Sequence, residues 1–298
     1  MSQAIAKKLE LGQTISKMDD IYLLVKFRLS LMVVISSALA YLIAAGGQLI
    51  WSVFGLLVVG GMAVTGASNG INQVLEKEYD ALMERTKLRP LAANRMKSSE
   101  AVLISGLMLV FGVICLSFIN PMVAFLGMLS FVLYAFLYTP LKRYSTVSVA
   151  VGAIPGALPV LIGVVAHDGT LTMLGMTLFL VQFLWQFPHF WAISFLSFDD
   201  YDNAGYKLLP KDSDGSIASN LGAYSAIYSL LIIPTIIWAY MAGLETQIWA
   251  LAGIIILTLI YTWMGIRLQI HKNRATALHL MFSSFFYLPL VLLLYLIG

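Results

Sequence analysis

Three oxygen-bearing side chains recur at four-residue intervals in one part of the sequence. Asn72, Glu76 and Asp80 follow one another at positions i, i+4 and i+8. On a helix this spacing places all three on one face, because successive members turn by only about 40° and rise by about 6 Å. Mg²⁺ prefers hard oxygen ligands and is often held by one or two carboxylates together with substrate phosphates. The spacing therefore predicts a metal site for a substrate that carries phosphate, with these three side chains as ligands.

Cationic side chains follow this first acidic segment. Arg85 and Arg89 come shortly after Asp80, and a guanidinium group holds a phosphate through two parallel hydrogen bonds. Pro90 predicts that the helix carrying these residues ends near Arg89. A solvated, salt-bridged helix end at a membrane surface would show the same pattern. Because this acidic segment continues directly from an apolar run, we favour the metal site over a solvated helix end.

A second acidic segment contains Asp199, Asp200 and Asp202. Three acids in four residues cannot all face one way on a helix, so we expect Asp199 or Asp200 to bind a second metal ion and Asp202 to be a surface residue. Lys207 follows as a candidate contact for a diphosphate. The spacing between Glu76 and Asp199 recurs between Tyr138 and Tyr261, which suggests two related halves whose acidic loops face one another across a shared cavity.

The composition indicates what surrounds these segments. Of 298 residues, 60% are hydrophobic and 11% are charged, whereas a typical soluble domain is about 25% charged. The net charge of +3 is too small for a nucleic-acid binder, so no such partner is expected. The lipid bilayer is the expected environment. Nine apolar runs are each long enough to cross it as a helix: Leu29–Gly46, Trp51–Ser68, Ala101–Phe118, Met122–Thr139, Val147–Ala166, Leu171–Ser194, Leu221–Met241, Trp249–Ile266 and Ala277–Ile297.

The distribution of basic residues predicts the topology. All 18 lysines and arginines fall in segments on one side of the nine runs, and the connectors on the other side carry none. The positive-inside rule makes the basic side cytoplasmic, with the N-terminus inside and the C-terminus outside. Both acidic segments fall on that side, so the active site is expected at the cytoplasmic face of the inner (plasma) membrane. Residues 1–20 are expected to form a polar cytoplasmic segment, and residues 1–298 a single membrane-embedded domain.

These motifs resemble those of the UbiA superfamily of intramembrane prenyltransferases, whose members carry two aspartate-rich motifs on a nine-helix bundle. The resemblance covers nearly the whole chain and begins with Asn72-x3-Glu76-x3-Asp80 and the following Arg89-Pro90-Leu91. Glu76 stands where aspartate is common in the superfamily, which keeps the oxygen ligand and lengthens its reach. Two further stretches resemble the motifs of the superfamily branch that farnesylates heme: Pro188-His189-Phe190-Trp191 and Asp200-Tyr201-x2-Ala204-Gly205.

The resemblance implies an all-α, UbiA-like integral membrane bundle that transfers a farnesyl group from farnesyl diphosphate to a vinyl group of heme b. Addition of water would give heme O for the assembly of heme–copper oxidases. Mg²⁺ would be the cofactor, heme b a substrate, and a heme A synthase a candidate downstream partner. An alternative is a UbiA-type prenyltransferase that acts on a quinone-precursor aromatic. A transporter would place ionisable residues within its spans, and the nine runs contain no Asp, Glu, Lys or Arg, which favours an enzyme.

The resemblance also implies roles for individual side chains. Lys26 and Arg28 are candidates for the heme propionates, and Lys142 and Arg143, like Lys207, for the diphosphate. Aromatic faces stabilise an allylic cation, a role assigned to Tyr138 and Trp191. The catalytic set is Asn72, Glu76, Asp80, Arg85, Arg89, Asp199 and Asp200, of which Asn72, Glu76, Asp80, Asp199 and Asp200 would bind metal.

His189 is the main candidate for heme recognition. It follows Pro188 and lies ten residues before Asp199, which predicts a position near the cavity mouth. A histidine that follows proline in a kinked helix can instead satisfy a freed carbonyl group. Both interpretations are open at this point.

Overall fold

The apolar runs become long helices in the computed structural model, which describes residues 15–298. No β-strand forms within this range, so the predicted all-α class is confirmed. The longer helices are α3 (Phe27–Ala45), α4 (Trp51–Leu75), α6 (Ser98–Ser117), α7 (Pro121–Val132), α9 (Ser148–Asp168), α10 (Met173–Leu196), α12 (Leu221–Leu230), α13 (Ile232–Met241), α14 (Ile248–His271) and α15 (Arg274–Ile297). The shorter elements are α2 (Lys17–Leu24), α5 (Lys77–Leu82), the π-helix η1 (Leu133–Tyr138), α8 (Thr139–Leu141) and α11 (Phe198–Asn203).

Eight helices between residues 15 and 298 are long and apolar enough to cross a membrane. Two of these spans are composite, because α7, η1 and α8 together form Pro121–Leu141 and α12 with α13 forms Leu221–Met241. The remaining predicted run corresponds to α10, a helix of 24 residues. Gln182, Gln186 and His189 lower the hydropathy of α10. The count of nine spans therefore stays a prediction, as does the orientation of the termini.

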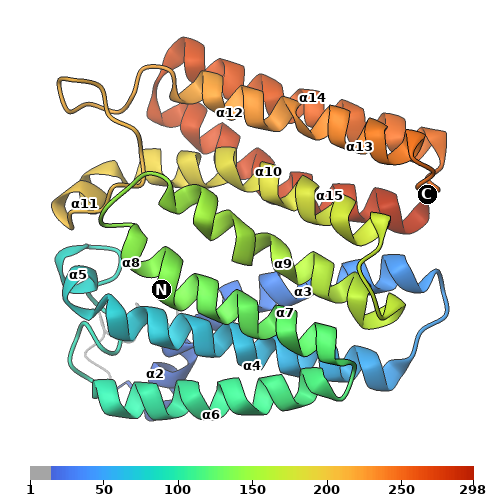
Figure 1. Ribbon diagram of the computed structural model, residues 1–298. Helices are drawn as coiled ribbons and strands as arrows, with labels where there is room; N and C mark the ends of the chain where they lie inside the picture. Colours follow the sequence, from blue (N-terminus) through green and yellow to red (C-terminus); the bar gives the residue numbers. More distant parts are fainter. Residues whose placement is uncertain (1–14) are drawn as a thin grey trace.

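The helices run side by side, and the connections divide unequally between the two ends of the bundle (Figure 1). α5, α8 and α11 lie at one end, together with the long connection from α11 to α12. The C-terminus and the short connection between α3 and α4 lie at the opposite end. Both acidic segments therefore lie at the same end of the bundle. Of the predicted polar segment 1–20, residues 1–14 lie outside the described residues, and the remainder leads into α2.

Two apolar cores lie on either side of α9, which contributes to both. One core is built mainly from α10, α14 and α15, and the other from α4, α7 and α9. The approach of α9 to α3 depends on Gly163, since a Cβ atom there would lie 2.1 Å from the carbonyl oxygen of Ser37. Only glycine leaves room for this contact between backbones. The central helices thereby form a fixed frame for the loops at the acidic end.

Candidate active site

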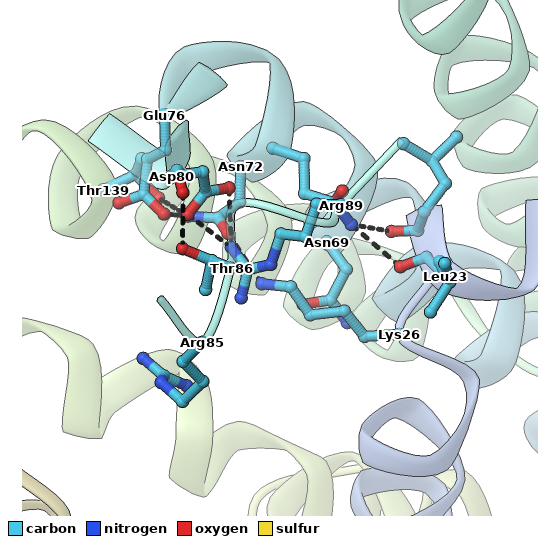
Figure 2. Close-up of polar contacts among 12 residues, drawn as sticks. Leu23, Lys26, Asn69, Asn72, Glu76, Asp80, Arg85, Thr86, Arg89 and Thr139 are labelled. Carbon is cyan, nitrogen blue, oxygen red and sulfur yellow. Dashed lines mark hydrogen bonds and ion pairs between the residues drawn. The ribbon is translucent and has the colours of Figure 1, made fainter. Parts of the chain in front are cut away.

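The first acidic segment is not one continuous helix. α4 ends at Leu75, Glu76 forms the junction, and α5 ends at Leu82, so the prediction of a helix reaching Arg89 was wrong. Side chains beyond α5 hold the turn that replaces it, because Thr86 Oγ1 donates to the carbonyl oxygen of Asp80 at 2.9 Å. The break still brings the three predicted oxygen-bearing side chains together, as Figure 2 shows.

Glu76 and Asp80 each face a cation. Lys142 Nζ forms an ion pair with Glu76 Oε1, and Arg89 Nη1 donates to both carboxylate oxygens of Asp80 at 2.7 Å. Both acids are buried, with 5% and 1% of their surface exposed. A buried charge without a partner is strongly destabilising. The two ion pairs therefore allow this acidic cluster to exist in the interior.

The amide of Asn72 joins Glu76 to a third cation. Its Nδ2 donates to Glu76 Oε2 at 2.9 Å and to Thr139 Oγ1 at 3.0 Å, while its Oδ1 accepts from Lys26 Nζ at 2.7 Å. These partners fix the direction of the amide, because an ammonium group only donates and a carboxylate only accepts. Asn72 thus turns its nitrogen toward Glu76 and its oxygen toward Lys26. In this arrangement its oxygen does not join the carboxylate of Glu76 as the spacing predicted.

Lys26 reaches the cluster through a kink between α2 and α3. Its backbone is left-handed, with φ of +46°, a strained conformation for a residue with a side chain. Gln73 Nε2 on α4 holds the kink by donating to the carbonyl oxygens of Leu23 and Leu24 at 2.9 and 2.8 Å. Asn69, one turn earlier on α4, also faces this kink (Figure 2). One helix therefore positions both Asn72 and the backbone that carries Lys26.

The proximity of these charges alters their acid–base behaviour. Burial lowers the pKa of Lys26 well below its ordinary value, with a contribution from Arg89 that Glu76 opposes. Burial acts to raise the pKa of Glu76, but Lys142 and Lys26 outweigh it and hold that pKa below its ordinary value. Burial, followed by the charge on Glu76, raises the pKa of Tyr206. Glu76 is therefore ionised at neutral pH, and the neighbouring tyrosine keeps its proton.

Tyrosine rings cover the cations of the cluster. Lys142 Nζ lies 4.8 Å from the ring centre of Tyr138 and 5.3 Å from that of Tyr206. The Arg143 guanidinium lies 4.6 Å from the ring centre of Tyr79 and donates to its hydroxyl at 2.6 Å. Ring faces attract cations, so the same rings could stabilise a carbocation formed beside the cluster. Tyr138 had been predicted here, whereas Tyr79 on α5 and Tyr206 in the loop after α11 carry no spacing signal and were missed.

The second acidic segment contacts the first, in agreement with the predicted juxtaposition. Asp200 Oδ1 accepts a hydrogen bond from the backbone N–H of Glu84 at 3.4 Å, and Arg85 donates to the hydroxyl of Tyr201 at 2.8 Å. Asp202 is exposed and pairs with Lys211. Among residues 15–298, no group of three histidine, cysteine, aspartate or glutamate side chains lies close enough to hold a metal ion. The carboxylates of the two acidic segments therefore do not form one cluster of three metal ligands within this range.

Several predicted site residues lie outside the Glu76–Asp80 cluster. Arg85 is exposed and points away from the cluster (Figure 2). Trp191 packs on Tyr228, with ring centres 5.3 Å apart, in the apolar contact between α10 and α12. Arg28 lies in the first turn of α3 and is exposed, whereas Lys26 precedes this helix in the left-handed kink. The remaining exposed side chains among the predicted residues are Arg28, Asp199 and Lys207.

His189 joins α10 to α15. Its ring stacks on Trp185 with centroids 4.8 Å apart, and its Nδ1 lies 2.7 Å from Ser284 Oγ. That hydroxyl donates its single hydrogen to the carbonyl oxygen of Met281 at 2.5 Å. Nδ1 must therefore carry the hydrogen, which leaves the lone pair on Nε2. The same ring can connect two helices through Nδ1 and offer Nε2 as a ligand.

Comparison with known proteins shows the family to which the chain belongs. The UbiA prenyltransferase family matches residues 33–288. A protein of Christiangramia forsetii named protoheme IX farnesyltransferase is 39% identical over 95% of this chain and 94% of its own length. One of the same name from Cytophaga hutchinsonii is 38% identical over 93% of this chain and 96% of its own length. The resemblance inferred from the motifs is confirmed.

Solved structures show the same fold. A structure from work on digeranylgeranylglyceryl phosphate synthase in membranes superposes with a TM-score of 0.79 at 20% identity, covering 95% of this chain and 99% of that one. A UbiA homolog from Archaeoglobus fulgidus bound to GPP and Mg²⁺ superposes with a TM-score of 0.65 at 13% identity, covering 93% of this chain and 99% of that one. At these identities the likeness establishes the arrangement of helices.

Proposed function

Because the chain belongs to the UbiA prenyltransferase family, we propose that it transfers the farnesyl group of farnesyl diphosphate to a vinyl group of heme b, with addition of water, to form heme O. The observation that carries this proposal is its similarity, over nearly the full length, to proteins named protoheme IX farnesyltransferase. The proposed product is consumed by a heme A synthase, which is the proposed downstream partner. Within the family, a quinone-precursor aromatic is the alternative acceptor.

The donor set of the site suits Mg²⁺. Glu76 and Asp80 supply buried carboxylate oxygens, and a site with one or two carboxylates completed by substrate phosphates is typical of this ion. A UbiA homolog of the same fold has been solved with GPP and Mg²⁺. We assign Glu76 and Asp80 to one ion, with Asn72 beside them, and Asp199 or Asp200 to a second. When bound, Mg²⁺ neutralises the charge that develops on the leaving diphosphate.

The chain's own residues would carry the other parts of the reaction. Lys26, Arg89 and Lys142 are close enough to one another to contact the diphosphate as the bond from the farnesyl carbon to oxygen breaks. The electron pair of that bond goes to the diphosphate, and the faces of Tyr138 and Tyr206 stabilise the allylic cation. The vinyl group of heme then attacks the cation, and water adds to the carbocation formed next to the macrocycle and loses a proton to the released diphosphate. Because Lys26 belongs to the diphosphate cluster, exposed Arg28 remains the candidate for a propionate.

A direct assay tests this function. The purified protein is incubated with farnesyl diphosphate, Mg²⁺ and either heme b or 4-hydroxybenzoate, and the products are identified by mass spectrometry. We expect a farnesylated, hydrated heme and no farnesylated hydroxybenzoate. If only 4-hydroxybenzoate were farnesylated, the acceptor would be a quinone-precursor aromatic and not heme b.

We further propose that α10 is the ninth span and that the acidic end of the bundle faces the cytoplasm of a cell whose inner membrane holds the protein. The location of the basic residues supports this orientation. Reporter fusions at Lys87 are expected to report a cytoplasmic location, and fusions at His167 and at the C-terminal Gly298 an external one. A cytoplasmic report from the C-terminus would contradict the nine-span topology.

His189 is expected to affect the acceptor and not the donor. Replacing His189 with alanine removes the Nε2 lone pair, so heme binding, followed by absorbance, should weaken and product formation should fall. Binding of a non-hydrolysable farnesyl diphosphate analogue should be nearly unchanged, because Glu76 and Asp80 are on other elements. Loss of both kinds of binding would assign His189 to the contact between α10 and α15. Retention of both, with normal turnover, would remove it from heme recognition.

A further inference from the structure

The hydroxyl of Thr139 lies where the π-helix η1 meets α4. Thr139 is almost completely buried, with 1% of its surface exposed. Its backbone N–H and its Oγ1 both donate to the carbonyl oxygen of Tyr134, the latter at 2.8 Å. The hydroxyl hydrogen is therefore committed, and its oxygen accepts from Asn72 Nδ2 at 3.0 Å. Thr139 was not among the predicted site residues, because its position at the end of an apolar run indicates no chemical role.

The wider turns of η1 explain how this hydroxyl reaches α4. A π-turn contains one more residue than an α-turn, so it rotates the residues that follow by about 100° relative to a continuous α-helix. Thr139 is the first residue after η1. Its side chain consequently faces Asn72 across the contact between the two elements. π-Turns of this kind are frequent at functional sites.

The contact from Thr139 completes the set of partners of the Asn72 amide. Both hydrogens of Nδ2 are used, one by Glu76 and one by Thr139, and Oδ1 is left for Lys26. Without the hydroxyl of Thr139, one buried amide hydrogen has no acceptor in this arrangement, and only the contacts with Glu76 and Lys26 then oppose rotation of the amide. A rotation that gives this hydrogen another acceptor would turn the amide oxygen away from the ammonium group of Lys26. The position of Lys26 thus depends on a residue that it does not touch.

We propose that Thr139 is a positioning residue for diphosphate binding: its hydroxyl fixes the Asn72 amide, which in turn holds Lys26 beside Glu76 and Asp80. Lys26 is suited to such control, because it lies on a strained left-handed backbone and its long side chain has many rotamers. Holding it in place in advance lowers the entropy lost when an anion binds. This inference rests on the proposed function, since the anion is the diphosphate of the prenyl donor.

Three variants test the role of the Thr139 hydroxyl. Thr139→Val keeps the shape of the side chain and removes its oxygen, whereas Thr139→Ser keeps the oxygen. Thr262→Val is the matched control, because Thr262 is also buried in a helix and its Oγ1 has no hydrogen-bond partner among the described residues. Purified proteins are compared in Mg²⁺ for the affinity of farnesyl thiodiphosphate, a slowly reacting analogue, and for KM and kcat.

We expect Thr139→Val to weaken analogue binding and to raise the KM for farnesyl diphosphate about five- to ten-fold, the effect of one lost hydrogen bond. The kcat at saturating donor and the KM for heme should change little. Thr139→Ser should restore the affinity, and Thr262→Val should behave as the parent protein. In a Lys26→Met background, Thr139→Val should have no further effect, because coupled residues are not additive.

The outcomes separate the inference from the function on which it rests. If the unmodified protein fails to bind the analogue in Mg²⁺, the proposed function is wrong. If it binds and Thr139→Val binds equally well, only the inference is overturned. Equal weakening by Thr139→Val and Thr262→Val, or failure of Thr139→Ser to restore affinity, would show that the threonine acts through packing. Additive effects with Lys26→Met would likewise overturn the route through Asn72.

Discussion

Replacing Asp80 with asparagine is expected to lower farnesyl transfer by at least about 100-fold, the size of effect seen when one preorganised charge-stabilising group is removed. The amide has nearly the same volume as the carboxylate, so the fold should survive. It lacks the negative charge of the carboxylate, so it holds Mg²⁺ less strongly, and it leaves Arg89 without the acid that it contacts at 2.7 Å. Initial rates at matched protein concentration, with thermal unfolding in detergent measured in parallel, distinguish lost chemistry from lost structure.

Asp202→Asn is the control for this prediction. Asp202 is exposed, and its pairing with Lys211 lies at the surface, where such pairs contribute about 1 kcal/mol or less. Its activity should therefore remain close to that of the parent protein. Asp200→Asn should reduce activity if the second segment also binds metal. Full activity of Asp80→Asn membranes would remove the first segment from the mechanism.

Replacing Lys142 with methionine is expected to destabilise the protein by about 3 kcal/mol, because Glu76 would be left as a buried carboxylate without its ion-pair partner. Both side chains of this pair are nearly inaccessible, with 10% and 7% of their surface exposed, so solvent screens their interaction little. The midpoint of thermal unfolding in the same detergent reports the change. Activity should also fall strongly, since Lys142 is a proposed contact of the diphosphate.

Two further variants test the cause of that loss. Lys17→Met disrupts an exposed ion pair with Glu100 at 2.8 Å, and it should change stability by less than about 1 kcal/mol. The double variant Lys142→Met with Glu76→Gln removes both charges, so stability should largely return while activity stays low. An equal loss from Lys17→Met and Lys142→Met would show that burial of the ion pair does not matter.

The helical spans and the position of the acidic cluster could be predicted because each depends on local sequence. An apolar run of about 20 residues can satisfy its own backbone hydrogen bonds in lipid only as a helix, which is why the predicted runs match the observed helices. The recurrence of Asn72, Glu76 and Asp80 also predicted that these three side chains lie close together. This prediction holds although the helix breaks at Glu76, because the three side chains still lie close together after the break.

The partners of the cluster could not be predicted, because they come from distant parts of the chain. Lys142 and Lys26 meet Glu76 and Asn72 only through the packing of η1 and α3 against α4. Spacing rules also treat neighbours as equivalent, and they grouped Arg28 with Lys26 although Lys26 bonds to Asn72 and Arg28 is exposed. The three amides Asn69, Asn72 and Gln73 near the end of α4 were a local signal for the polar contacts of this helix.

The ion pairs within the cluster have a consequence for product release. Arg89 and Lys142 are bonded to carboxylates of the same chain, so in the proposed reaction an incoming diphosphate competes with Asp80 and Glu76 for these cations. After transfer, the same carboxylates compete with inorganic diphosphate, and each contact it gives up is replaced at once by an internal one. The exchange lowers the free energy needed for departure. These internal partners thus set a limit on how long the leaving group stays bound and favour the next turnover.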